Sequence, residues 1–188
     1  NMKGFTILLI IIFLIPYYSC KKQDKNGSLD DKLVKTLEIR VPDIKLIPLR
    51  AACFRMGSVY GDADETPVHT VVFTKNILMG KYEITNSQVA AVYTWGLVNG
   101  KIRADEEAVV NTGENKRKLM DIGYPDCRLH VADEVFTVIE GFEEHPCTLI
   151  TWYGAVMFCT LLSRIEGREQ VYSSSDFSCD WEKDGYRL

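Results

Sequence analysis

Apolar residues recur at helical spacing within residues 85–100, directly after a polar start signal. Thr85 and Gln88 form a capping box, in which the threonine hydroxyl accepts from a backbone N–H and the glutamine side chain reaches back. Gly96 or Gly100 supplies the stop. The apolar positions that follow the cap are Val89, Val92 and Tyr93. This pattern predicts a helix.

A second amphipathic helix is predicted between a Thr151 cap and Gly167. Its inner stripe, at the spacing of one helix face, consists of Trp152, Ala155, Val156, Cys159 and Leu162. On this interpretation Cys159 is a core thiol and not a nucleophile.

Shorter stretches favour strands. Residues 33–49 alternate loosely and are interrupted by Pro42 and Pro48, which suits edge strands or extended backbone. Residues 68–84 are rich in Val, Ile, Phe and Thr, and they predict two strands joined by a short Lys-Asn turn.

Residues 134–139 predict a further strand with turns on both sides, whereas residues 101–118 are mostly charged and carry no predicted element. Asp184-Gly185 is a turn pair, so residues 186–188 are expected to begin a strand. Short strands, two helices and long loops together predict an α+β domain.

The N-terminus has the pattern of an export signal. Lys3 precedes an apolar run over residues 5–18 that is shorter than a membrane-spanning helix needs, and Ser19-Cys20 follows it. The small residue Ser19 directly before Cys20 resembles the lipobox of bacterial lipoproteins, in which the cysteine is acylated. An uncleaved signal anchor with an incidental cysteine is the alternative. We expect residues 1–19 to be a signal peptide and Cys20 to be the lipidation site.

After Cys20 the chain is polar and charged, which is typical of a flexible tether. The predicted organisation is therefore a lipidated cysteine, a tether and an extended leading segment over residues 20–45, followed by a domain over 46–188. The protein is expected to be exported and anchored on the periplasmic or cell-surface side of a membrane.

The composition limits the classes of partner that the protein is expected to bind. The chain has 188 residues, 46% of them hydrophobic, which is enough for one domain with appendages. The formal net charge is only −4 with both signs mixed along the chain, so no basic field for nucleic acid exists.

Six cysteines occur, and lipidation of Cys20 leaves five thiols in an export setting that permits disulfides. Because five is odd, at least one thiol is expected to stay free or to pair between chains. No C-x-x-C spacing occurs, so nothing indicates a zinc site or a redox dithiol.

The remaining candidates for chemistry are weak. His69, His130 and His145 lack metal-ligand spacing and are interpreted as structural or surface residues. A nucleophile pair of Cys147 with His145 is conceivable from the sequence, but no catalytic motif surrounds it. The acidic residues Asp62, Asp64 and Glu65 are interpreted as a solvated loop, because they lack the spacing of a calcium loop.

Four ordered stretches resemble one family. They are "FRMGSVYGDADETPVHTVVFTKNILMGKYEITNSQ", "CRLHVADEVFTVIEGFEEHP", "ITWYGAVMFCTLLSRIEGREQVY" and "WEKDGYRL". In this order they are similar to the domain of formylglycine-generating enzymes, or sulfatase-modifying factors, as found in spirochaete-like bacterial lipoproteins. The resemblance covers about residues 46–188 and implies a fold related to C-type lectins. It also implies that Met56-Gly57 ends a strand, and that Glu83, Thr85 and Asn86 form a structural strand-to-helix junction.

Two departures from the family pattern stand out. The segment "IPLRAACFRMG" lacks the usual glycine, and Gly154 stands where the second helix usually carries an acidic residue. In the family, "GYRL" is followed by a C-terminal half with the cysteine pair that binds copper and the residues that coordinate calcium. None of these residues has a counterpart here, so no catalytic, cofactor-binding or metal-binding residue is assigned and no cofactor is expected.

Three hypotheses follow for function. The chain is a membrane-anchored lipoprotein with a truncated, non-catalytic domain; or a sulfatase-modifying oxidase that converts cysteine to formylglycine, if the natural gene product is longer; or a lectin-like surface protein that binds protein or glycan. A truncated gene and an incomplete sequence are both compatible with the first hypothesis.

Overall fold

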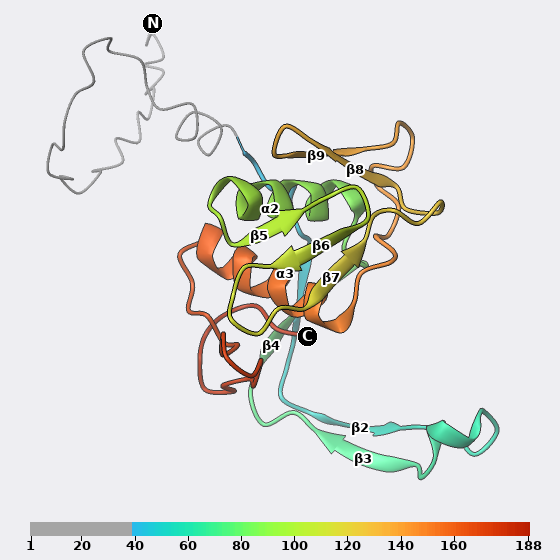
Figure 1. Cartoon of the computed structure of the whole chain (residues 1–188). Coiled ribbons are helices and arrows are strands. Elements are labelled where there is room, and N and C mark those ends of the chain that lie inside the picture. The colour runs from blue at the N-terminus through green and yellow to red at the C-terminus, as the bar shows by residue number, and fades with distance from the viewer. Residues whose placement is uncertain (1–38) are drawn as a thin grey trace, which may run out of the picture.

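A computed structural model of the chain describes residues 39–188 (Figure 1). Its elements are β1 (Leu46–Leu49), β2 (Cys53–Met56), the 3-10 turn η1 (Ala63–Glu65), β3 (His69–Val72), β4 (Ile77–Gly80), α2 (Asn86–Val98), β5 (Ile102–Ala104), β6 (Ala108–Asn111), β7 (Lys118–Asp121), β8 (Leu129–Ala132), β9 (Val135–Val138) and α3 (Trp152–Ile165). The predicted α+β class, with two helices and short strands, is confirmed. The predicted signal peptide, Cys20 and most of the tether lie outside the described residues.

The first predicted helix is α2, and its capping box is present. The backbone N–H of Gln88 donates to the Thr85 hydroxyl at 3.4 Å, and the Gln88 side chain accepts from the Thr85 N–H at 2.9 Å. Asn86 donates to the carbonyl of Phe142 at 2.9 Å, which fixes the helix start to a distant loop. The helix ends at Val98, and Gly100 follows with a left-handed φ of +64°, as a helix stop requires.

The second predicted helix is α3, capped as expected by Thr151, whose hydroxyl accepts from the Gly154 N–H at 3.1 Å. Val156, Cys159 and Leu162 are buried, so the inner stripe is confirmed at these positions. The prediction is wrong for Trp152, which is 55% exposed. Trp152 is the first residue of α3, and at this end of the helix the predicted stripe points away from the core. Its ring packs edge-on against that of Tyr153.

Two glycines allow the helices to approach their neighbours closely. A Cβ at Gly154 would collide with the backbone carbonyl of Leu119, so α3 lies directly on β7 at this point. A Cβ at Gly96 would meet Leu161 at 2.8 Å, where α2 and α3 cross. The Gly154 departure from the family pattern therefore has a local cause: no acidic side chain fits there.

The charged stretch over residues 101–118, together with the residues just after it, forms a sheet that the sequence pattern did not predict. Strands β5, β6 and β7 form an antiparallel sheet in that order, and a bulge interrupts the register at Val109/Val110. The stretch is charged because short strands with one face on the helices expose the other face. The buried hydrophobic residues of the three strands are Ile102, Val109, Leu119 and Met120.

The strand predicted over residues 134–139 is confirmed as β9, which pairs with β8 in a hairpin. Asp133 and Glu134 form its tight turn, with φ of 50° and 62°. The N–H of Phe136 donates to the hydroxyl of Thr94 at 2.9 Å, which ties β9 to α2. The helices, the three-stranded sheet and this hairpin share one apolar core, and we call them the body.

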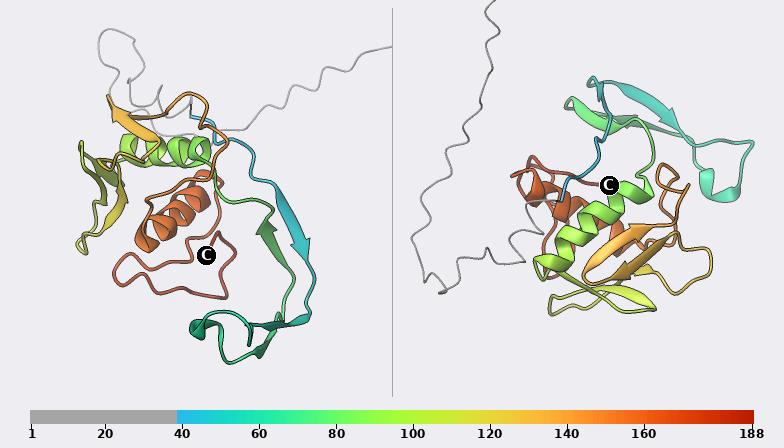
Figure 2. Two further views of the ribbon diagram at one scale, coloured as in Figure 1. Left: turned by 90° about the vertical axis from the view of Figure 1, so that its right-hand side faces the viewer. Right: turned by 90° about the horizontal axis from the view of Figure 1, so that it is seen from above.

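The remaining strands form a ribbon, residues 46–80, that we call the arm. The two strands predicted over residues 68–84 exist but do not pair with each other: β4 pairs with β1 next to the body, and β3 pairs with β2 further out. As predicted, β2 ends at Met56, and Gly57 takes a φ of +98°. In both views of Figure 2 the arm stands away from the body.

Residues 186–188 are not in a strand, so that prediction is wrong. The N–H of Tyr186 donates to the hydroxyl of Ser163 on α3 at 2.9 Å, and the N–H of Leu188 donates to the Tyr172 hydroxyl at 2.9 Å. Side-chain oxygens thus take the place of a neighbouring strand for these backbone donors.

Candidate functional site

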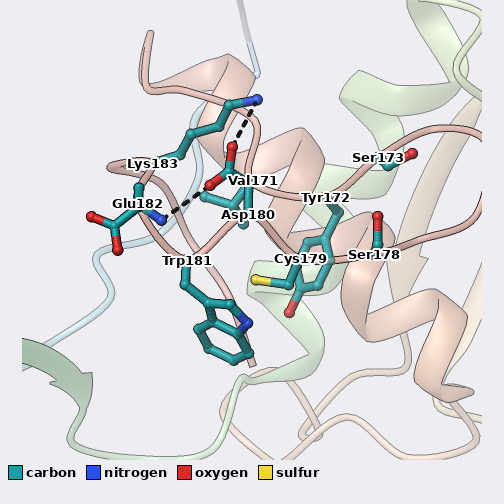
Figure 3. A pocket seen from close by; sticks show the side chains of 9 residues that line it. All are labelled: Val171, Tyr172, Ser173, Ser178, Cys179, Asp180, Trp181, Glu182 and Lys183. Carbon is teal, nitrogen blue, oxygen red and sulfur yellow. Dashed lines mark hydrogen bonds and ion pairs between the residues drawn. The ribbon is translucent and has the colours of Figure 1, made fainter.

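A depression of about 660 Å³ lies on the segment that follows α3. Its lining comes from two antiparallel stretches that meet at the bridge between Tyr172 and Cys179. The residues that line it are Val171, Tyr172, Ser173, Ser178, Cys179, Asp180, Trp181, Glu182 and Lys183 (Figure 3).

The turn between the two stretches is fixed from both sides. Phe177 is buried and packs edge-on against Tyr153 of α3, with ring centroids 5.0 Å apart. The Asp176 carboxylate accepts from the N–H and the hydroxyl of Ser178 at 3.1 and 2.8 Å. Hydrogen bonds from the Ser173 hydroxyl and from Ser178 lower the pKa of Asp176 to about 2, so this carboxylate is ionised at any physiological pH.

Arg187 holds the rim of the depression. Its guanidinium donates to the carbonyls of Trp181 and Lys183 at 3.1 and 3.0 Å, and it lies 5.7 Å from the Trp181 ring centroid. Trp181 is 66% exposed, so one apolar ring remains available to a ligand. In Figure 3 the rings of Trp181 and Tyr172 point to the same side of the segment.

Two carboxylates, those of Asp180 and Glu182, flank Trp181 in the lining and point away from the two rings in Figure 3. Asp180 accepts from the N–H of Glu182 at 3.1 Å and makes an ion pair with Lys183 at 3.9 Å. Glu182 makes an ion pair with Lys75 of the arm at 2.7 Å, with both side chains largely exposed. The depression therefore combines aromatic faces with hydrogen-bond acceptors and one cation.

The sequence reasoning missed this site. The sequence analysis gives this segment only a strand start at residues 186–188, although an isolated tryptophan among charged residues is a signal for an exposed aromatic side chain. A second cavity of about 130 Å³ lies at the base of the arm, beside the α2 cap. Its Thr85 and Gln88 are occupied by the capping box, which gives this cavity a structural role.

The thiols are not arranged for nucleophilic chemistry. All five cysteines in residues 39–188 are free thiols. Burial raises the pKa of Cys147 and Cys159 to about 12, and it also raises the pKa of Cys127. Because the thiolate is the nucleophile and the metal ligand, these three thiols are protonated and weakly reactive at neutral pH.

The histidines and the acidic loop are at the surface, as interpreted. His69, His130 and His145 are exposed, and Asp62, Asp64 and Glu65 occupy the exposed tip of the arm around η1. His145 packs on the ring of Phe142 at 5.0 Å, while Cys147 is partly buried. Within the described part of the chain, no group of three or more His, Cys, Asp or Glu residues could hold a metal ion.

The comparisons with known proteins give one result. Residues 34–188 match the model of the sulfatase-modifying factor enzyme 1-like domain. The chain belongs to this family. The match includes both helices, the arm and the segment with the depression, so the resemblance of the four ordered stretches is confirmed. No curated protein and no solved structure matches the chain. Over residues 39–188, neither helix has the length and apolar character to cross a membrane.

Proposed function

We propose that the protein is an exported lipoprotein, anchored to a membrane by lipid on Cys20, whose sulfatase-modifying-factor-like domain binds a protein or glycan ligand and is non-catalytic. The anchor is supported by the sequence order of Lys3, a short apolar run and Ser19-Cys20. Several acyl chains on one cysteine supply stable membrane affinity. The domain then faces the periplasm or the cell exterior.

One observation carries the binding role: the exposed ring of Trp181, which the carboxylates of Asp180 and Glu182 flank along the chain, lines a depression of about 660 Å³. Ligand sites combine apolar walls with a few placed polar groups. A sugar ring offers an apolar face of C–H bonds and a rim of hydroxyl donors. The indole ring of Trp181 suits the apolar face of the sugar, and the carboxylate oxygens of Asp180 and Glu182 suit its hydroxyl donors.

The rim is also organised before a ligand arrives. Arg187 fixes the backbone on both sides of Glu182 through its two carbonyl contacts. Ordering a loop costs binding free energy, and a loop that is already held loses less. By contrast, the buried thiols Cys127, Cys147 and Cys159 are protonated at neutral pH, which supports binding over thiol chemistry.

A glycan array probed with the full chain in mild detergent tests the binding role. We expect retained spots for the wild type and at least tenfold weaker binding for Trp181→Ala, since stacking on the indole is lost. Trp152→Ala is the matched control, because Trp152 is also exposed but lies on α3 outside the depression. Equal loss in both variants, or no binding to any glycan or extracellular protein, would contradict the proposal.

The anchor is tested by mass spectrometry of the chain isolated from a bacterial host. We expect Cys20 to be acylated and the chain to fractionate with membranes, and Cys20→Ser to abolish both. An unmodified wild-type chain in the soluble fraction would overturn this part of the proposal.

A second candidate function is the oxidation of a sulfatase cysteine to formylglycine, which the description of the matched family favours. The reaction leaves an aldehyde on a client peptide. Incubation of the natural gene product with a sulfatase-derived cysteine peptide, copper and oxygen tests it. An aldehyde detected with a hydrazide reagent would establish this function and remove the non-catalytic proposal.

A further inference from the structure

The outer part of the arm is a two-stranded ribbon with little support from the body. Strands β2 and β3 pair only with each other in the described structure, so each has an open edge. An isolated two-stranded ribbon is marginally stable in water, and open edges favour association with another chain. This ribbon therefore has a physical reason to be covered.

One face of the ribbon is mainly apolar, and it also carries His69, which lies opposite Met56. From the register, Phe54 and Met56 lie on the same face as Val71, and Phe73 continues that face, with its ring centroid 5.7 Å from that of Phe54. Phe54 is 45% exposed and Met56 53%. The opposite face carries Cys53, Arg55, Thr70 and Val72 and is mixed in character.

The ribbon also carries opposite charges at its two ends. The end near the body has Arg50 and Lys75, and residues 44–61 and 66–82 contain no acidic residue. The tip around η1 has three carboxylates: Asp62, Asp64 and Glu65. Val59 and Tyr60 next to the tip are exposed, Tyr60 almost fully at 97%.

We propose that two copies of this chain associate through their arms, with the apolar faces of the two β2–β3 ribbons in contact and the ribbons antiparallel. In this arrangement the acidic tip of each copy lies against the basic end of the other, so both ends of the contact are attractive. A two-fold axis makes the same patch serve both copies. The charge pattern fixes the direction, because parallel ribbons would place like charges together.

The proposal does not depend on the binding role of the depression. It does involve the same region, since Lys75 contacts Glu182 at the rim. That ion pair is between exposed side chains and contributes little to stability, so its loss alone is a mild change.

Co-purification of full chains that carry two different affinity tags, in mild detergent, tests the association. Wild-type copies are expected to co-purify and to have the mass of a dimer by light scattering. Phe54→Asp is expected to weaken co-purification at least tenfold. Val72→Asp lies on the opposite face of the same ribbon at similar exposure and is expected to retain it.

Charge reversal tests whether opposite charges at the ribbon ends hold the two copies together. Arg50→Glu with Lys75→Glu makes both ends of the ribbon acidic, and Asp62→Lys with Asp64→Lys makes both ends mainly basic. Each variant alone is expected to lose self-association, and a mixture of the two is expected to recover it. Glu182→Gln, which removes only the ion pair to Lys75, is expected to leave association unchanged.

All substituted residues are exposed, and circular dichroism with a thermal melt verifies that each variant folds. A monomeric wild type overturns the proposal and leaves the ribbon for a different partner or a lipid surface. Association that survives Phe54→Asp overturns the assigned face. Failure of the mixed charge-reversed copies to associate overturns the antiparallel arrangement.

Discussion

Leucine side chains occupy opposite environments in the body and in the arm. Leu161 on α3 is 1% exposed in the shared core, whereas Leu78 on β4 is 60% exposed. The strands of the arm are as apolar as those of the body, yet they have no helix against them. An apolar strand in this chain therefore marks a surface that favours burial. Other elements of the same chain bury such strands in the body, but not in the arm.

The largest expected effect comes from filling the closest approach in the body. Gly154→Asp places a carboxylate against the Leu119 carbonyl where not even a Cβ fits, so α3 must move off β7. We expect a loss of at least about 3 kcal/mol in the free energy of unfolding, from overpacking and a buried charge. Urea denaturation measures it. Gly80→Asp on the exposed arm is the control, and an equal loss there would contradict the distinction between the two regions.

Truncation of the two leucines compares the regions directly. Leu161→Ala is expected to cost about 3 kcal/mol because it leaves a cavity in a close-packed core. Leu78→Ala is expected to stay within about 0.5 kcal/mol, as is usual for a surface position. Thermal and urea unfolding of the two variants measure the two losses in the free energy of unfolding, and their ratio compares the regions. Equal costs would mean that the arm is covered in the folded chain.

The helix cap is expected to have a smaller effect. Thr85→Ala removes the hydroxyl that accepts from Gln88 and is expected to cost about 1 kcal/mol. Thr85→Ser keeps the oxygen and is expected to recover most of it. If both variants lose the same stability, then methyl packing rather than the cap is responsible.

Thiol chemistry gives the mildest comparison. Iodoacetamide at pH 8 is expected to label the exposed Cys53 of the arm much faster than Cys147 and Cys159, whose pKa burial raises to about 12. Mass spectrometry of peptides follows each site, with the urea-unfolded chain as the reference for full labelling. Equal rates in the folded chain would contradict the burial of these thiols.

The raised pKa of Cys147 and Cys159 makes the stability of the fold depend on pH. These buried thiols have a folded pKa above the unfolded value of about 9, so the folded state binds more protons at intermediate pH. Their contribution to stability is complete below about pH 9 and is lost as the pH rises towards 12. A Cys53→Ser variant should follow the wild-type curve.

Local signals in the sequence predicted the helices well. The helix caps at Thr85 and Thr151 and the glycine stops depend only on neighbouring residues. The ends of both helices can therefore be predicted without knowledge of the tertiary structure. Trp152 was misassigned because helical spacing says nothing about which end of the stripe reaches the core. The sheet at residues 101–118 was missed because its short strands expose one charged face and carry only a few apolar residues.

The candidate site was not predictable in the same way. The segment after α3 folds back on itself, and its two stretches meet at the antiparallel bridge between Tyr172 and Cys179. Only this folding brings together Trp181, Tyr172 and Arg187. No spacing rule connects these residues. Family resemblance pointed to a C-terminal half for chemistry, and it gave no expectation for the depression in this segment.

The buried hydroxyl of Ser163 has a consequence for exchange kinetics. It donates to the Cys159 carbonyl within α3 and accepts from the Tyr186 N–H, and it is fully buried. The amide proton of Tyr186 therefore exchanges with deuterium only when the last segment lifts from α3, whereas Ser163→Ala frees that proton while α3 keeps its own protection. One oxygen atom thus makes the opening of the segment visible at a single amide.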